Sequence, residues 1–349
     1  MRNKTERTGM FGFLRRFFAH DLAMDLGTAN TLLSAAREDM LVNEPSVVAL
    51  DAVSGAVLAV GTEAKAYLGR TPRKIRAVRP MKDGVIADFD VTRKMISYFV
   101  GKAIGRSRLF RPSMVISIPS GITQVEKKAV IDAALLAGAG NVRLMEEPLA
   151  AALGAGLPVR EPVASMVLDI GGGTSEVAVI SLSAMSVTQS LRIAGDAMND
   201  AVRRYLHDVF ALDVGENAAE RLKIELGTAI PIDDGRTAVI MGKDVVLGTP
   251  KTVTVSEAHV REALRYPLQA IAGAVVRVLE MTPPELAADI YERGMLLAGG
   301  GGLLRGLDRY LSAAARIRVT VDGDPLTAVL RGAATAMRGG SMYEEMFIN

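Results

Sequence analysis

Residues 168–176 read LDIGGGTSE: an apolar run delivers Asp169, three glycines follow, and β-forming residues resume after Thr174. Glycine lets backbone N–H groups approach phosphate oxygens without a Cβ in the way, and a threonine hydroxyl adds a donor. The stretch therefore predicts a strand, an acidic turn that binds phosphate, and a second strand. A single copy of the pattern leaves an ordinary tight turn open as the alternative.

The same pattern occurs near the start of the chain, where residues 24–31 read MDLGTANT and Asp25 stands in the place of Asp169. Two such hairpins facing each other would hold a triphosphate from both sides. The backbone and side-chain contacts would come from Gly27, Thr28, Ala29 and Asn30 on one side and from Gly171, Gly172, Gly173 and Thr174 on the other. Asp25 and Asp169 would hold a hydrated Mg²⁺, which keeps several waters and meets only one or two carboxylates.

A third glycine cluster, Gly299, Gly300, Gly301 and Gly302, follows the apolar run Leu296–Ala298 and leads into a helix-like stretch. Backbone N–H groups that no side chain covers, at a helix N-terminus, can contact a base, a sugar or a phosphate. A flexible connector is the alternative. Three glycine turns, each after an apolar strand, favour a nucleotide site.

These motifs lie within long stretches that resemble the MreB family of bacterial actin homologues, part of the superfamily of actin, sugar kinases and heat-shock chaperones. The resemblance covers nearly the whole chain. It rests on DLGTANTLL (25–33), LVNEPSVVAL (41–50), RPMKDGVIADFDVT (79–92), EEPLAAALGAGLP (146–158), LDIGGGTSEVAVIS (168–181), AERLKIELG (219–227) and TPPELAADIYERGMLLAGGGGLLRGLD (282–308). It implies an α/β, actin-like fold, a duplicated ribonuclease H-like architecture with two lobes around a nucleotide cleft.

Composition agrees with a protein of this kind. A length of 349 residues suggests about two domains, and 49% hydrophobic residues can fill large cores. The absence of cysteine excludes disulfides and zinc–thiolate sites, and the three histidines are scattered. A formal charge of +2 and the absence of tryptophan give no case for nucleic-acid binding.

The chain divides at residues 156–162 (GLPVREP), which read as a linker. Alternating β-rich and helical stretches suit an α/β architecture. The expected parts are an N-terminal segment (1–20), a first lobe (21–157, small subdomain near 41–80), a second lobe (158–325, small subdomain near 196–255) and a C-terminal helix returning to the first lobe with a tail (326–349).

Local patterns predict several elements. Strands are expected at 42–50, 56–60, 114–118 and 142–145, and helices at 91–104, 149–153 and 218–226. Thr123 and Glu126 have the spacing of a capping box, so another helix should begin after Thr123 and run to about Ala137.

The candidate catalytic group lies in Met145-Glu146-Glu147-Pro148, where a strand end places carboxylates near the expected cleft. A carboxylate there can orient or deprotonate the attacking water, because phosphoryl transfer depends on positioning and electrostatics. The resemblance makes Glu147 the first choice and Glu146 the second, with Thr174 helping to fix the water or the γ-phosphate. The alternative is stabilisation of a helix N-terminus by its acids.

The base and ribose contacts depend on the resemblance. By spacing alone, Glu220 and Lys223 predict a solvated helix face with a weak ion pair. The matched motif instead implies that Glu220, Arg221, Leu222 and Lys223 border adenosine and ribose, with Gly299–Gly302 closing the other side. The chain departs from common family members in having Ala298 and Ser175 in place of threonines. It also has Asn199-Asp200 in place of an acidic pair, a change expected not to touch the phosphates.

Two segments predict membrane contact. In the first, Phe13, Leu14, Phe17 and Phe18 form one helical face beside Phe11, while Arg15 and Arg16 fall elsewhere on the wheel. Aromatic residues with basic neighbours suit a helix lying among anionic headgroups, although the segment could instead pack on the domain. The second segment is residues 106–112, where Leu109 and Phe110 stand among three arginines.

The resemblance thus implies an ATP- and Mg²⁺-dependent cytoskeletal protein with slow ATPase activity coupled to polymerisation. Its expected partners are further copies of itself in paired protofilaments, the inner membrane surface, and cell-wall synthesis and shape proteins, but no nucleic acid. It would act in the cytoplasm at the inner face of the membrane. The alternatives are an FtsA-like or plasmid-segregating filament protein of the actin superfamily, and a small-molecule kinase.

Overall fold

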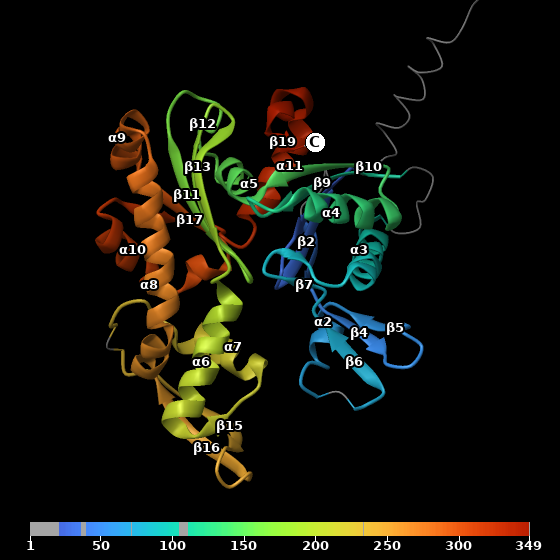
Figure 1. Cartoon of the computed structure of the whole chain (residues 1–349), viewed down its shortest axis with the longest axis vertical. Helices are drawn as coiled ribbons and strands as arrows, with labels where there is room; N and C mark the ends of the chain where they lie inside the picture. The colour runs from blue at the N-terminus through green and yellow to red at the C-terminus, as the bar shows by residue number, and fades with distance from the viewer. Residues whose placement is uncertain (1–20, 36–39, 71, 105–110, 233, 349) are drawn as a thin grey trace, which may run out of the picture.

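The computed structural model describes residues 21–35, 40–70, 72–104, 111–232 and 234–348, which form two lobes (Figure 1). The residues expected to contact the membrane lie outside this part of the chain: Phe11, Phe13, Leu14, Phe17, Phe18, Leu109 and Phe110. Among the described helices, none has both the length and the apolar character that crossing a bilayer requires.

The first lobe is built on a six-stranded sheet in the order β19-β10-β9-β1-β2-β3. An antiparallel meander supplies β1 (Leu22–Leu26), β2 (Asn30–Ala35) and β3 (Met40–Pro45). Next to β1, β9 (Ser113–Ile118) and β10 (Asn141–Glu146) run parallel to it, and β19 (Phe347–Ile348) closes the edge.

The second lobe repeats this topology in a five-stranded sheet, β13-β12-β11-β17-β18. Its meander consists of β11 (Ser165–Ile170), β12 (Ser175–Ser181) and β13 (Ala184–Leu191). The strands β17 (Met295–Ala298) and β18 (Val319–Val321) then run parallel to β11. The two lobes are therefore the duplicated halves of an α/β, actin-like fold, as the sequence predicts.

Helices cover both sheets, which explains why their central strands are apolar on both faces. On the first lobe these are α3 (Phe89–Ile104) and α4 (Gln124–Leu136), and on the second α8 (Glu257–Met281), α9 (Pro284–Arg293) and α10 (Leu307–Ala315). Between the sheets lie α5 (Glu147–Gly154) and α11 (Ala328–Gly339), whose buried side chains share one core with residues of both sheets. At their crossing Gly154 and Gly332 leave no space for a Cβ, so the two backbones touch.

Each lobe carries a small subdomain at the lower end in Figure 1. In the first lobe it contains β4 (Val48–Asp51), β5 (Val57–Val60), α2 (Thr62–Lys65) and β6 (Ile75–Val78). In the second it contains α6 (Gly195–Phe210), β14 (Leu212–Asp213), α7 (Glu216–Leu226), β15 (Thr237–Asp244) and β16 (Pro250–Ser256). A short hairpin of β7 (Met81–Lys82) and β8 (Val85–Ile86) links the first subdomain to its lobe.

Most local predictions are confirmed. Thr123 caps α4 through a complete capping box with Glu126. The helices predicted from 91, 149 and 218 begin two residues earlier, at Phe89, Glu147 and Glu216.

The prediction of one strand over 42–50 is wrong. Ser46 ends β3, because its hydroxyl donates to the carbonyl of Gly27 at 2.7 Å and hydrogen-bonds the hydroxyl of Thr31 at 2.9 Å. The chain then turns into β4, which belongs to a different sheet. Ser46 therefore stabilises the first acidic turn by hydrogen bonds to both of its sides, Gly27 and Thr31.

Candidate functional site

The two glycine turns face each other between the lobes. A Cβ on Gly172 would lie 2.6 Å from the Cβ of Ala29, and one on Gly173 would lie 2.6 Å from the Oγ1 of Thr28. Only glycine permits this approach, so the two hairpins are in direct contact. The duplicated motif therefore forms one site rather than two.

Hydrogen bonds within the second hairpin and from a neighbouring turn hold the two hairpins in place. In the second hairpin the amide of Gly171 donates to the carbonyl of Thr174 at 2.9 Å, which closes the turn. In the first, the hydroxyl of Thr28 accepts from the amide of Gly84 at 2.9 Å. Gly84 has a φ of +77° in the turn between β7 and β8 and also packs against Thr174, so this turn touches both hairpins.

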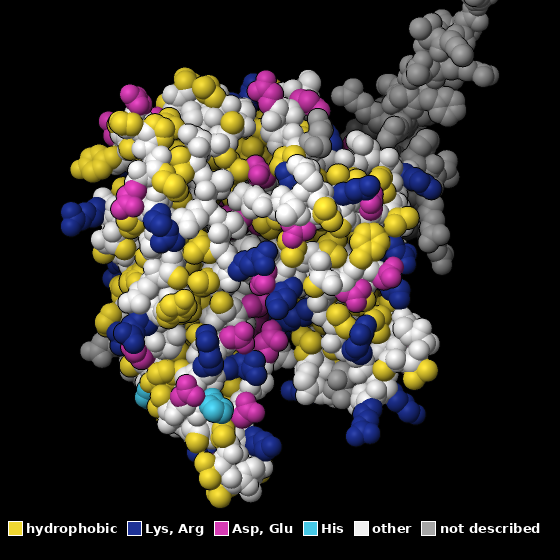
Figure 2. Space-filling model, viewed as in Figure 1, with side chains coloured by type: hydrophobic (Ala, Val, Ile, Leu, Met, Phe, Trp, Pro, Cys, Tyr) yellow, Lys and Arg dark blue, Asp and Glu magenta, His cyan; other side chains and the backbone are white. Residues whose placement is uncertain are grey.

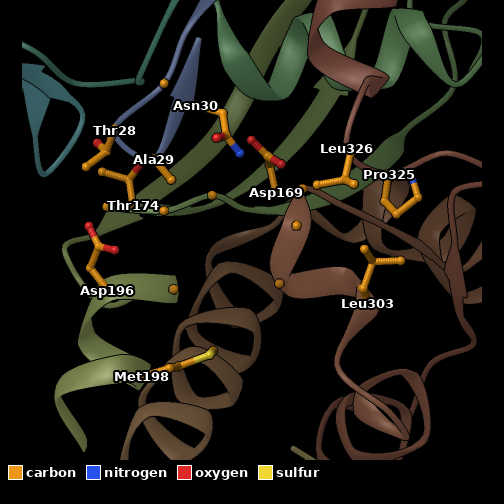
Figure 3. Close-up of a pocket in the computed structure, with 18 of the residues that line it drawn as sticks. Thr28, Ala29, Asn30, Asp169, Thr174, Asp196, Met198, Leu303, Pro325 and Leu326 are labelled. Atoms are coloured by element: carbon orange, nitrogen blue, oxygen red, sulfur yellow. The ribbon is translucent and has the colours of Figure 1, made fainter. Parts of the chain in front are cut away.

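A cavity of about 370 Å³ opens between the hairpins and extends into the second lobe (Figure 3). Its walls include most of the predicted nucleotide-binding residues: Gly27, Thr28, Ala29, Asn30, Gly171, Gly172, Gly173, Thr174, Glu220, Lys223, Gly299, Gly300 and Gly301. Three of the predicted residues do not line it. Arg221 is exposed to solvent, Leu222 is buried in the core, and Gly302 lies against Leu297 and Pro325.

The predicted carboxylates Asp25, Glu147 and Asp169 all line the wall of this cavity. Burial raises the pKa of Asp25 to about 6, and the hydroxyl of Ser117 at 3.2 Å opposes that rise. Burial raises the pKa of Asp169 to about 8, and the nearby charges of Asp25 and Glu176 add to it. Crowded buried acids of this kind favour a bound cation.

The two glutamates of the Glu-Glu-Pro step have different positions. Glu147 is the first residue of α5, is buried and lines the cavity. Burial raises its pKa well above the ordinary value, and the charges of Glu176, Asp25 and Asp169 raise it further. Glu146 ends β10 and does not line the cavity, and its pKa is raised by burial and lowered by Lys127. Of the two, only Glu147 has access to a molecule in the cavity.

Glu176 is a buried acid that the sequence reasoning missed. Its carboxylate oxygens accept hydrogen bonds from the Ser120 amide at 2.9 and 3.0 Å, and Oε1 also accepts from the Ser120 hydroxyl at 3.0 Å. Burial raises its pKa to about 7, while these donors lower it. Because Ser120 follows β9 and Glu176 lies on β12, this contact joins the two lobes.

The second lobe supplies further wall residues from α6, which the sequence reasoning also missed. The amides of Gly195 and Asp196 donate to the carbonyls of Gly171 and Gly172, at 3.1 and 2.8 Å, and fix the start of α6 against the second hairpin. Asp196, Met198 and Asn199 line the cavity as a result. The only sequence signal was the Gly-Asp step.

Asn199, whose change from the common acidic residue is expected not to touch the phosphates, lies in the wall of this cavity. Asn199 is buried in the cavity wall, and its Oδ1 has no hydrogen-bond partner among the described residues. Asp200, by contrast, is exposed and pairs with Arg203 at 3.2 Å. The far end of the cavity is closed by apolar groups that include Leu303, Pro325 and Leu326 (Figure 3).

The residues present fit a hydrated magnesium ion. Asp169 has a buried Oδ1 without a hydrogen-bond partner among the described residues, beside the Asp25 carboxylate. Within the described part of the chain, no group of three or more His, Cys, Asp or Glu side chains is arranged to hold a metal alone. This arrangement suits a cation that keeps its waters and is shared between phosphate oxygens and one or two carboxylates.

Comparisons with known proteins agree with this geometry. Residues 19–345 match the family model of the MreB/Mbl protein. The cell shape-determining protein MreB of Escherichia coli K12 is 48% identical over 342 residues, covering 95% of this chain and 98% of that protein. Mbl of Bacillus subtilis 168 is 45% identical, covering 90% of this chain and 95% of that protein. The crystal structure of MreB5 of Spiroplasma citri bound to ADP superposes with a TM-score of 0.88 at 32% identity, covering 92% of this chain and 97% of that one. The chain therefore belongs to the MreB/Mbl family of actin-like, cell shape-determining proteins.

Proposed function

We propose that this chain binds ATP with Mg²⁺ between its lobes and polymerises into membrane-associated filaments that direct cell shape by organising cell-wall synthesis. The contact between the two glycine turns carries the proposal, because it brings one turn from each lobe together at a single cavity. Support comes from MreB5 of Spiroplasma citri, a relative of the same fold whose structure holds ADP. Family membership favours this function over an FtsA-like protein, a plasmid-segregating filament or a kinase.

Each wall of the cavity has a role in this proposal. Turns 27–30 and 171–174 donate backbone N–H groups to the phosphates, since both turns line the cavity. Glu220 and Lys223 lie on the ribose side, and the apolar end near Leu326 takes the base. Asp25 and Asp169 would hold the waters of a bound Mg²⁺, and the ion would neutralise charge on the phosphates.

Hydrolysis would depend on Glu147. Its carboxylate lies in the cavity wall on the first turn of α5, where it can orient the attacking water and accept a proton from it. A raised pKa makes a carboxylate a better proton acceptor than an ordinary glutamate once it is ionised. Thr174, against the Gly84 turn, holds the water or the γ-phosphate.

The remaining parts of the proposal concern assembly. ATP bridging the two lobes would favour end-to-end contacts between copies, and slow hydrolysis would follow assembly. The two apolar segments would attach the filament to the inner face of the membrane through Phe11, Phe13, Leu14, Phe17, Phe18, Leu109 and Phe110. At the membrane its partners would be wall-synthesis and shape proteins. The composition of the two segments, aromatic residues amid arginines, supports this attachment.

Phosphate release from the Glu147→Ala variant tests the catalytic assignment. We expect a fall of about a hundredfold or more with ATP still bound, because a positioned general base contributes on this scale. Glu146→Ala is the matched control and should retain most of the activity, because Glu146 does not line the cavity. Unchanged hydrolysis by Glu147→Ala would remove this residue from the mechanism.

Sedimentation with ATP and anionic liposomes tests filaments and membrane attachment together. The wild-type protein should pellet above a critical concentration and bind liposomes. Replacing Phe13, Leu14, Phe17 and Phe18 by serine should weaken liposome binding while filaments still form. Failure to pellet, together with phosphorylation of a sugar, would favour the kinase alternative.

A further inference from the structure

Ion pairs cross the mouth of the cleft between the two small subdomains. Lys65, the last residue of α2, places its Nζ 2.7 Å from a carboxylate oxygen of Glu220 on α7. Arg79 follows β6 directly. Its Nη2 lies 2.5 Å from Oε1 of Glu216, and its Nη1 lies 3.8 Å from Oδ1 of Asp196. Both cations belong to the first lobe, and all three acids belong to the second.

These pairs share residues with the nucleotide cavity. Asp196 and Glu220 line the cavity, whereas Lys65, Arg79 and Glu216 do not. Lys223 completes the set, because its Nζ donates to the carbonyl of Gly195 at 3.0 Å and its side chain also lines the cavity. Separation of the two small subdomains would therefore withdraw the partners of residues that contact the ligand.

The charges of this group balance and are partly shielded from water. The cations Lys65, Arg79 and Lys223 offset the acids Asp196, Glu216 and Glu220, and the four side chains of the two shortest pairs are 21% to 36% exposed. Figure 2 shows acidic and basic side chains gathered where the two lower subdomains approach each other. Burial raises the pKa of Asp196, and the nearby charge of Arg79 opposes that rise.

We propose that Lys65 and Arg79 form a cross-cleft clasp: they position the acidic wall of the second lobe and must separate from it before nucleotide leaves. Lys65 fixes one carboxylate oxygen of Glu220, so the side chain has a defined orientation at the cavity wall. Arg79 ties the first turns of α6 and α7 to the first lobe. The clasp thereby links the closed state of the lobes to retention of the ligand. This inference rests on the proposed nucleotide binding.

The test measures release of a fluorescent ATP analogue, chased with unlabelled ATP, from the full chain below the concentration at which filaments form. Lys65→Ala and Arg79→Ala should each release it about fivefold faster, the effect expected for one partly exposed pair. Added salt should accelerate release from the wild type and have less effect on the variants, because ion pairs are screened. Arg76→Ala removes an exposed cation of the same subdomain and should release at the wild-type rate.

A charge exchange separates the clasp from general damage to the fold. Arg79→Glu should release quickly, and adding Glu216→Arg should slow release again, because Glu216 does not line the cavity. Wild-type release rates for both Lys65→Ala and Arg79→Ala, or equal acceleration by Arg76→Ala, would overturn the clasp. Absence of binding by the wild type would instead overturn the proposed function.

Discussion

The two acidic hairpins occupy equivalent places in their sheets, but their aspartates have different neighbours. Asp25 on β1 stands in register with Ser117 of β9, whose hydroxyl donates to it at 3.2 Å. Asp169 on β11 stands in register with Ala298 of β17, which has no hydroxyl. Burial raises the pKa of both, to about 6 for Asp25 and about 8 for Asp169. The duplicated backbone thus repeats the position of the acid, while its neighbours differ: the Ser117 hydroxyl lowers the pKa of Asp25, and the charges of Asp25 and Glu176 raise the pKa of Asp169 further.

The largest expected effect comes from a methyl group placed where the hairpins meet. In Gly173→Ala the new Cβ would approach Thr28 Oγ1 at 2.6 Å and the backbone of Asp83 at 2.9 Å, so the lobes must separate. ATP affinity should fall about tenfold to a hundredfold, as overpacking of this kind costs. Titration with a fluorescent ATP analogue measures the change.

Gly171→Ala is the matched control from the same turn. A Cβ there meets only the carbonyl of Thr174, at 3.4 Å, which is ordinary contact. Because Gly171 lines the cavity, its new Cβ can hinder a phosphate locally, but the hairpins stay in contact, so ATP affinity should fall less than in Gly173→Ala. Equal losses in the two variants would show that loop flexibility, rather than contact between the hairpins, decides binding.

The next effect is a pH dependence that differs between the hairpins. In protein free of metal and nucleotide, Asp169 keeps its proton up to about pH 8, whereas the unfolded chain loses it near pH 3.8. The native state therefore binds more protons within that window, so its stability must fall as pH rises through it. For Asp25 the window ends near pH 6. The slope is about 1.4 kcal/mol per pH unit for each such group.

Urea unfolding over a pH series measures these slopes. Asp169→Asn should reduce the slope between pH 6 and 8, where Asp25 no longer contributes but Glu147 and Glu176 still do. Asp25→Asn should reduce the slope mainly between pH 4 and 6. Identical curves for the two variants would contradict the difference between the hairpins.

The smallest expected effect comes from exchanging the side chains that stand in register with the two aspartates, Ser117 and Ala298. Ala298→Ser offers Asp169 a hydroxyl, so the pKa of Asp169 should move down toward that of Asp25. Ser117→Ala is the mirror variant and should raise the pKa of Asp25. The same pH series should show changes of about 1 kcal/mol in opposite directions, the scale of one hydrogen bond. A shift in the same direction for both would reject the explanation.

Much of the fold could be predicted from short-range patterns. The acidic hairpins, the capping box at Thr123 and the buried strands are local signals, and each appears where the sequence places it. The strand end before Pro148 placed two carboxylates near the cleft, but only the family resemblance singled out Glu147 from Glu146. Arg221 and Leu222 show the limit of motif reasoning, since neighbouring residues on a helix point in different directions: of the four predicted residues of this motif, Glu220 and Lys223 line the cavity and Arg221 and Leu222 do not.

The rest depends on contacts between distant segments. Ser46 breaks a continuous β-type stretch because Gly27 and Thr31 lie beside it only in the folded sheet. Asn199 enters the cavity because α6 begins against the second hairpin, which no local pattern shows. Glu176 reads as one residue of an alternating strand, but its partner Ser120 comes from the other lobe.

The glycine contact between α5 and α11 has a mechanical consequence. Where Gly154 and Gly332 meet, the backbones touch directly and leave no side chain to change rotamer. This crossing lies in the core shared by the two sheets, and the small subdomains lie far from it at the lower end in Figure 1. It can therefore serve as a pivot between the two lobes. A slight rotation at this pivot would then become a larger displacement at the distal surfaces.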